Sequence, residues 1–204
     1  MHPLEAVTEQ DIPRVAALLA RAFEQDPFWR WLAPRDSRYM QRLEKGFAAQ
    51  LQKLVLPLGV AYLTPCGGGA ALWSPPGTWD TRLRTRLPML PALVPVCGLR
   101  RLPSRLLGIE RIQAMHPSGP HWYLQVLGVE PGRQGEGLSR TLLDPVLDRC
   151  DREELPCWLE TATPDNLSLY RRFGFEVRDE IRLPGGGPPL WGMWRAPRPD
   201  QEFT

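Results

Sequence analysis

The chain has 204 residues and a formal net charge of +2, from 25 basic and 23 acidic side chains. This balance leaves no electrostatic footprint for nucleic acid or an anionic membrane surface, and the longest apolar runs are far shorter than the roughly 20 residues that cross a bilayer. The length and the ordinary share of apolar residues predict one globular domain spanning residues 1–204.

The four cysteines, Cys66, Cys97, Cys150 and Cys157, do not have the spacing of metal ligands. We therefore expect no metal site. Cys150 and Cys157 flank a short loop and could approach one another, but buried free thiols are the commoner outcome. The expectation is a cytoplasmic protein with reduced thiols.

The first half of the chain predicts a short edge strand, two helices and a hairpin. Thr8 is placed to cap the first helix, and the turn 66–69 carries three glycines for the hairpin. The predicted ranges are a strand at 4–7, helices at about 11–23 and 38–53, and strands at 59–64 and 70–74.

The second half begins with an irregular insert rich in Pro and Leu, residues 76–120. Beyond it, apolar runs and helical periodicity alternate, and the residues from 197 onward are expected to be frayed. The predicted ranges are strands at 122–129 and 157–162, helices from 138 and from 163 to 172, and strands at 176–183 and 190–194.

A glycine-rich turn joins the strand at 122–129 to the following helix. Gly135 and Gly137 leave the backbone bare where the helix begins, and N–H groups in the first turn of a helix are free to bind a diphosphate. The turn is neither a dinucleotide fingerprint, because Arg140 stands where a third glycine is required, nor a P-loop, because no lysine follows Lys53. The alternative is that the two glycines only allow a tight connection between strand and helix and bind no ligand.

A second motif lies about 30 residues downstream, where a short strand is followed by a helix that ends at Phe173-Gly174-Phe175. Asn166 and Tyr170 are four residues apart in that helix, so they share one face. Plain packing by Tyr170 and capping by Asn166 remain open at this point.

The two motifs in this order resemble the GNAT acetyltransferases. The GNAT acetyl-coenzyme A signature Q/R-x-x-G-x-G/A aligns with residues 134–139, and Ser139 departs from its last position. The likeness is greatest to the branch that contains puromycin N-acetyltransferase, along residues 121–177 and in the phrases 22–27 and 71–76.

The resemblance implies an α+β fold: a single GNAT-type domain with a mixed, mostly antiparallel sheet, helices on both faces and a V-shaped split between the fourth and fifth strands. In such folds a bulge in the fourth strand opens the split, and Gly128 is the residue expected to supply it. The implied cofactor is acetyl-CoA, with the pantetheine arm paired to the fourth strand. The implied cofactor-binding residues are Leu127, Gly128, Val129, Gln134, Gly135, Glu136, Gly137, Leu138, Ser139 and Asn166.

Direct acetyl transfer to an amine needs a base and an acid. The resemblance implies Tyr170 as the acid that protonates the leaving sulfur. Glu160, at the end of a strand where partial burial would raise its pKa, is the first choice of base. Asp26 is the second choice and His121 the third.

The chain carries eight tryptophans, and several follow the first helix or end a strand near the expected acceptor cleft. We therefore expect an aromatic acceptor pocket formed by Phe28, Trp31, Trp73 and Trp122, with Trp29 nearby, for a small, antibiotic-like or aromatic primary amine. The competing interpretation is that these aromatic side chains only pack in the hydrophobic core. The expected partner is this amine, with neither nucleic acid nor membrane, and the protein is expected to be a monomer or homodimer. An acetyl-CoA-binding sensor and a protein or peptide N-acetyltransferase remain alternatives.

Overall fold

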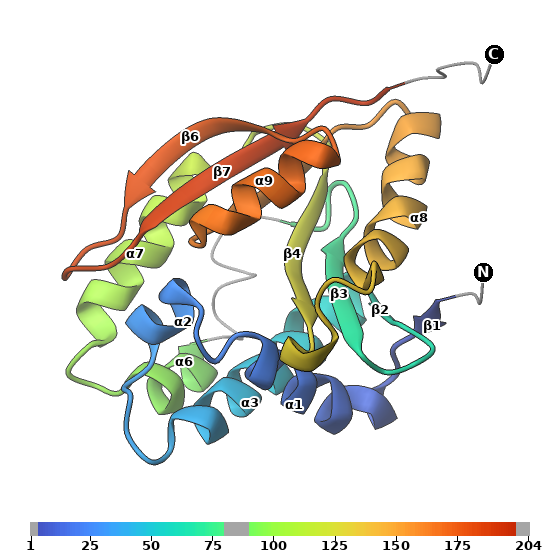
Figure 1. The fold of residues 1–204 in the computed structure, drawn as a ribbon. Coiled ribbons are helices and arrows are strands. Elements are labelled where there is room, and N and C mark those ends of the chain that lie inside the picture. Colours follow the sequence, from blue (N-terminus) through green and yellow to red (C-terminus); the bar gives the residue numbers. More distant parts are fainter. Residues whose placement is uncertain (1–3, 80–89, 199–204) are drawn as a thin grey trace.

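The computed structural model describes residues 4–79 and 90–198, and its centre is a mixed sheet of seven strands (Figure 1). The strand order is β1-β2-β3-β4-β5-β7-β6, and β4 and β5 form the one parallel pair among the described strands. The strands are β1 (Glu5–Ala6), β2 (Val60–Leu63), β3 (Gly69–Ser74), β4 (Trp122–Val129), β5 (Cys157–Thr161), β6 (Glu176–Arg182) and β7 (Pro189–Arg195). The predicted α+β class and the predicted strands are confirmed.

β4 and β5 part after a short parallel ladder. They pair from Trp122 with Cys157 as far as Leu124 with Leu159, although β4 continues to Val129. Beyond Leu124 the β5-facing backbone of β4 is left out of the ladder, so the predicted split between these strands is present.

The bulge lies at Gln125 and not at Gly128, where we expected it. On the β3 side, Leu72 pairs with Val126 and Trp73 pairs with Leu124, so Gln125 is the extra residue. Gly128 keeps regular pairing with Ala70. Its lack of a side chain serves packing instead, because a Cβ there would lie 2.6 Å from Leu19 Cδ2 and 3.2 Å from Ala22 Cβ.

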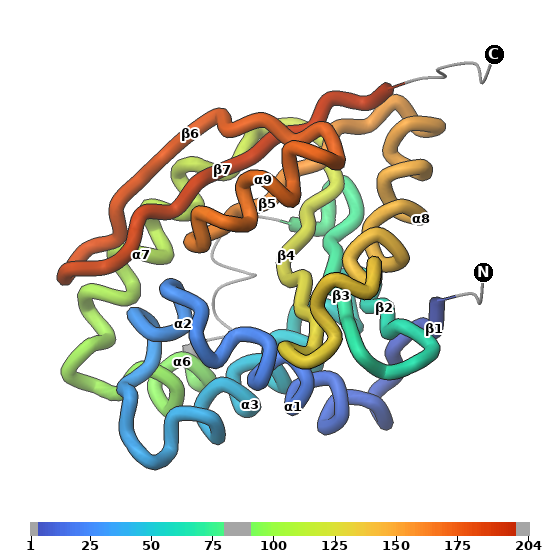
Figure 2. Tube along the Cα trace, viewed as in Figure 1, coloured from blue at the N-terminus to red at the C-terminus, as the bar shows by residue number. Residues whose placement is uncertain are grey.

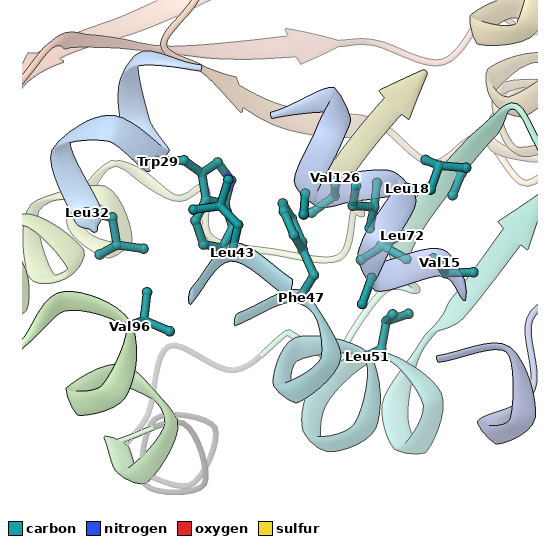
Figure 3. Packing of buried hydrophobic residues seen from close by; sticks show 14 of the residues in the cluster. Val15, Leu18, Trp29, Leu32, Leu43, Phe47, Leu51, Leu72, Val96 and Val126 are labelled. Atoms are coloured by element: carbon teal, nitrogen blue, oxygen red, sulfur yellow. The ribbon is translucent and has the colours of Figure 1, made fainter. Parts of the chain in front are cut away.

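Helices cover both faces of the sheet, as predicted. Ala70 and Leu72 of β3 pack in one core with α1 (Ile12–Ala22) and α3 (Tyr39–Gln50), whereas Ala71 and Trp73 pack in a second core with α8 (Leu138–Arg152). This alternation follows from the two-residue period of a strand. Figure 3 shows the first core, where Leu18, Phe47 and Val126 gather between helices and sheet.

Two helices occupy most of the described part of the segment that we expected to be irregular. They are α6 (Leu90–Cys97) and α7 (Leu102–Met115), and both lie on the side of the molecule where α2 (Pro27–Leu32) also lies (Figure 2). We did not predict these helices because the segment is rich in proline. Pro91 and Pro103 nevertheless stand in first turns, where proline is tolerated. The short helix α2, capped by Asp26, was also missed.

The remaining elements agree with the sequence. Thr8 and Asp11 bond to one another at the start of the first helical segment, through Thr8 N to Asp11 Oδ2 at 2.9 Å. α9 (Pro164–Arg172) follows β5, and α3 continues into a π-helical turn (Leu51–Val55) and a last short turn, α4 (Leu56–Leu58). All four cysteines are free thiols. The predicted fraying of the tail falls largely on residues 199–204, outside the described residues.

No helix in the described ranges combines the length and the apolar run that crossing a membrane requires. Nor do residues 4–79 and 90–198 bring three or more His, Cys, Asp or Glu side chains together in a way that would hold a metal ion.

We expect Gly128→Ala to lower the free energy of unfolding by about 2 kcal/mol, because its methyl group would force Leu19 and α1 away from β4. Gly132→Ala is the matched control, since no atom lies within 4 Å of a Cβ built there. Denaturant unfolding of both variants measures the difference. Equal stability of the two variants would contradict close packing at Gly128.

Candidate active site

A cavity of about 800 Å³ lies beside the split between β4 and β5. Its wall is mainly apolar and comes from α2, α3, α6, α7, β4, β5 and α9. Three carboxylates line it, those of Asp26, Glu110 and Glu160, and no described Lys, Arg or His does. A cavity with this wall favours a ligand that combines a cation with an apolar body.

Tyr170 and Asn166 line this cavity together, as their spacing on one face of α9 requires. Tyr170 is only 6% exposed, and its hydroxyl has no hydrogen-bond partner within the described ranges. Burial, followed by the nearby charge of Asp26, raises the pKa of Tyr170, so the hydroxyl keeps its proton at neutral pH. The side-chain amide of Asn166 donates to Thr161 Oγ1 at 3.4 Å.

Asp26 lines the same cavity, but both of its oxygens have structural partners. Oδ1 accepts the N–H of Trp29 at 3.1 Å and so caps α2, and Oδ2 accepts the Thr163 hydroxyl at 3.1 Å. Burial raises the pKa of Asp26, and these hydrogen bonds oppose the shift. Asp26 thus joins α2 to the start of α9.

Glu160 stands at the end of β5 and is nearly enclosed, with 8% of its side chain exposed. Its Oε1 accepts the indole N–H of Trp158 at 2.6 Å and lies 3.4 Å from His116 Nδ1. His116 Nε2 lies 2.9 Å from His121 Nε2, and His121 Nδ1 lies 2.8 Å from the carbonyl oxygen of Gly119. A continuous chain therefore runs from the cavity through Glu160 and His116 to His121.

With Glu160 ionised and both imidazoles neutral, this chain is one proton short of complete hydrogen bonding. The Gly119 carbonyl can only accept, so His121 Nδ1 is protonated. Complete hydrogen bonding needs one further proton between the two Nε2 atoms and another between His116 Nδ1 and Glu160. Two neutral imidazoles hold only two of these three protons. A proton accepted at the Glu160 end supplies the third, and every contact of the chain is then kept. Burial lowers the pKa of His121, which favours its neutral imidazole.

Sequence reasoning missed His116 because it lies in the segment that we expected to be irregular. The available signal was its position five residues before His121, which the bend at Ser118–Gly119 turns into a contact.

The structure gathers a different set of aromatic rings around the cavity from the one expected. Phe28 and Trp29 line it, and so do Trp79 and Tyr123, which were not predicted. The buried indole N–H of Trp79 has no acceptor among the described residues and is available to a ligand.

Trp31, Trp73 and Trp122 do not line the cavity. Trp73 and Trp122 are fully buried in the core beneath α8, on the other face of the sheet. Trp31 lies on the opposite side of α2, where its indole N–H donates to the carbonyl of Pro184 at 2.8 Å. The alternation of side chains along β3 and the turn of α2 direct these rings away from the cavity.

The turn at residues 134–139 lies at the end of β4, and the structure leaves it open. Gly135 and Gly137 have φ values of 87° and 79°, and a Cβ built at either would have no atom within 4 Å. Leu138 begins α8, so the first-turn N–H groups, including that of Ser139, have no partner within the helix. A free carboxylate at Glu136 would repel a diphosphate, but this one is paired with Arg133 at 2.8 Å. The turn fits the diphosphate of a coenzyme.

Along β4, Leu127 lines the cavity, whereas Gly128 packs against α1 and Val129 pairs with Gly69. The parting from β5 leaves one edge of this segment available for added hydrogen bonds.

Residues 73–175 match the family model described as the acetyltransferase (GNAT) family, which is half of the chain. The chain belongs to the GNAT acetyltransferase family. It is an N-acetyltransferase by that membership, and the family uses acetyl-CoA as acetyl donor.

Individual relatives agree with this membership. An uncharacterised N-acetyltransferase of Schizosaccharomyces pombe is 29% identical over 96% of this chain and 84% of the relative. The solved structure described as histone acetyltransferase HPA2 and related acetyltransferase, from Corynebacterium glutamicum, superposes with a TM-score of 0.71 at 26% identity over 98% of both chains. Arylalkylamine N-acetyltransferase 2 of Aedes aegypti shares the fold, with a TM-score of 0.60 at 12% identity over 96% and 98% of the two chains.

We expect Gly137→Ala to weaken coenzyme A binding about tenfold, because a residue other than glycine at this φ shifts the first-turn N–H groups. Gly98→Ala is the control: Gly98 also has a positive φ, 75°, and no atom near a Cβ, but lies between α6 and α7. Titration calorimetry with coenzyme A compares them. Equal loss of affinity in both variants would remove the special role of the turn.

Proposed function

We propose that this GNAT acetyltransferase acetylates the primary amine of a small molecule with an apolar or aromatic body, in the manner of the branch that contains puromycin N-acetyltransferase. The observation that carries the proposal is the charge of the cavity. Carboxylates are the only charged groups among its described lining residues, and most of the remaining wall is apolar or aromatic. An ammonium group is attracted by that field, while the body of the molecule replaces water along the wall.

Acetyl-CoA, when bound, supplies the acetyl group as a thioester. The bare N–H groups of residues 134–139 hold its diphosphate, and the free edge of β4 at Leu127, Gly128 and Val129 pairs with its pantetheine arm. Asn166 lines the cavity beside Tyr170 and fixes the thioester end. This assignment separates an anion site at the turn from a cation site in the cavity.

Glu160 acts as the base. It removes a proton from the ammonium group of the acceptor, and accepting that proton completes the hydrogen bond between Glu160 and His116. The amine nitrogen then bonds to the acetyl carbon as the carbon–sulfur bond breaks. Tyr170, whose raised pKa keeps its hydroxyl protonated and which has no described hydrogen-bond partner, gives its proton to the departing sulfur. It regains a proton from the nitrogen, which loses its second proton as it becomes an amide.

The cover over the cavity favours a small acceptor over a peptide. α6 and α7 contribute apolar residues to the wall, among them Leu93, Val96 and Leu106. A peptide acceptor needs a long open groove, whereas apolar residues of α6 and α7 line this cavity together with those of α2. The whole chain, residues 1–204, then acts as one acetyltransferase domain with this cover as its acceptor lid.

We expect release of coenzyme A thiol with aromatic or apolar primary amines, including puromycin, and little release with spermidine or with peptides bearing free N-termini. The physical reason is the apolar wall, which a polyamine or a peptide backbone would leave with unpaired polar groups. A thiol assay across such a panel gives kcat/KM for each class. Preference for polyamines or for peptides would exclude the proposed acceptor, and binding of the coenzyme without release across the panel would favour a sensor.

We expect Tyr170→Phe to lower kcat about 100-fold with coenzyme A affinity unchanged, because the substitution removes the proton given to sulfur and keeps the ring. Tyr62→Phe on β2 is the control, and its turnover should match the parent protein. Steady-state kinetics and calorimetry provide both readouts. Undiminished turnover of Tyr170→Phe would assign the ring to packing alone.

We expect Glu160→Gln to lower kcat/KM about 100-fold near neutral pH and to lose part of that deficit at high pH, where the amine is already neutral. Asp26→Asn is the discriminating variant. Its amide still caps α2, so the variant should keep most activity. Profiles of kcat/KM against pH separate the two carboxylates. The reverse order of effects would make Asp26 the base.

A further inference from the structure

A second hollow, of about 790 Å³, lies on the side of α2 that faces away from the catalytic cavity. It is bounded by α2, the start of α7 and the turn between β6 and β7, which lie side by side in Figure 1. Guanidinium groups dominate its lining, and none of its described lining residues is Asp or Glu. We call it the arginine hollow; its arginines are Arg30, Arg35, Arg100, Arg101, Arg105 and Arg182.

Arg105 is the member that packing alone explains least well. It is 6% exposed and makes no ion pair with any described carboxylate. Its guanidinium stacks on the Trp31 ring at 4.4 Å and donates to Ser104 Oγ at 2.8 Å and to the Trp31 carbonyl. Its Nε–H is buried and has no acceptor in the described ranges. A buried cation in this state is costly unless an anion joins it.

The neighbouring cations increase that cost. Burial and the like charge of Arg101 both lower the pKa of Arg105. Arg30 also has a buried Nε–H without a described acceptor. Like charges that converge without a counter-charge destabilise the fold, and a bound oxyanion would reverse the sign of this interaction.

Backbone groups add to the same hollow. At the start of α7, Leu102 N donates to the Leu99 carbonyl, Pro103 has no N–H and Arg105 N donates to the Arg101 carbonyl. The Ser104 N–H is therefore the one first-turn donor without an acceptor among the described residues, and it lies beside the hollow. Across from it, Gly185 and Gly186 have successive φ values of 67° and 74°, and a Cβ at Gly185 would lie 3.6 Å from an Arg105 nitrogen. Bare backbone beside guanidinium groups is how proteins bind phosphate.

We propose that the arginine hollow is a binding site for a small phosphorylated molecule, separate from both the coenzyme turn and the acceptor cavity. Its phosphate oxygens accept N–H donors of Arg105, Arg101 and Arg30, whose side chains line the hollow. A volume of about 790 Å³ exceeds what a single phosphate fills, so the ligand carries a diphosphate or a phosphate with an organic body. Guanidinium groups suit this ligand because their donors match two phosphate oxygens at once.

The test is titration of inorganic pyrophosphate into the full chain. In the first arm coenzyme A is present at saturation, so that the turn at 134–139 is occupied. In the second arm the Gly137→Ala variant is titrated without coenzyme A. This arm keeps the test valid if the turn does not hold coenzyme A. We expect one pyrophosphate per chain, a shift of the Arg105 Nε–H resonance on binding, and about tenfold weaker binding for each of Arg105→Gln and Arg101→Ala.

Arg152→Ala, an exposed arginine at the end of α8, removes the same charge and should leave pyrophosphate affinity unchanged. Arg101 is exposed, so its variant is informative even if Arg105→Gln does not fold. Absence of pyrophosphate binding, equal weakening by Arg152→Ala and Arg101→Ala, or an unmoved Arg105 resonance would each overturn the proposal. Acetyl transfer is not measured, so the result is independent of the proposed function.

Discussion

The parting of β4 from β5 is the constraint on which the rest of the structure depends. One extra residue, Gln125, shifts the register of β4 against β3 just beyond Leu124, where the ladder with β5 ends. The Gln125 side chain is held by Ser74 Oγ at 2.6 Å and by Gln50 at 2.9 Å, so sheet and α3 both fix the bulge. Backbone that would otherwise pair between strands is thereby freed along one edge, and Tyr170 reaches the cavity from α9 on the far side of the split. A continuous parallel ladder would occupy the free edge of β4 and would also close the gap through which Tyr170 reaches the cavity.

Close packing transmits this geometry to the coenzyme turn. Gly128 allows α1 to rest directly on β4, and the salt bridge between Arg21 and Glu130 joins the same helix to the residue that follows β4. Arg133 then bonds to Glu136 and to the Cys66 carbonyl of the β2–β3 hairpin. The turn that presents bare N–H groups is thus held by its neighbours on both sides, although it is itself exposed. A rigid support under an open turn reduces the ordering cost of binding a diphosphate.

The sequence predicted those parts of the molecule that local chemistry determines. The strand at 122–129, the turn with its two glycines and the face shared by Asn166 and Tyr170 all depend on residues within one or two turns of each other. The prediction of a bulge at Gly128 was wrong. A glycine is a plausible local cause of a bulge, whereas the register at Gln125 depends on Ser74 and Gln50, far away in the chain. The tryptophans failed for a related reason. Which face of β3 lies under α8 decides that Trp73 is core, and no motif near Trp73 reports that choice. His116 directly follows α7, and its position could not be predicted because the proline near the start of α7 had argued against a helix there.

The two faces of α2 bring opposite electrostatics within one short helix. Its cap, Asp26, and the rings of Phe28 and Trp29 face a cavity whose described charges are negative, while Arg30 and Trp31 face a hollow whose described charges are positive. A six-residue helix has little stability of its own. Its position therefore depends on the hydrogen bond from the Thr163 hydroxyl, at the start of α9, to Asp26. It also depends on Trp31, which packs between Gly108 of α7 and Gly187 of the β6–β7 turn. The position of α2 therefore sets one wall of both hollows, because the same backbone carries both.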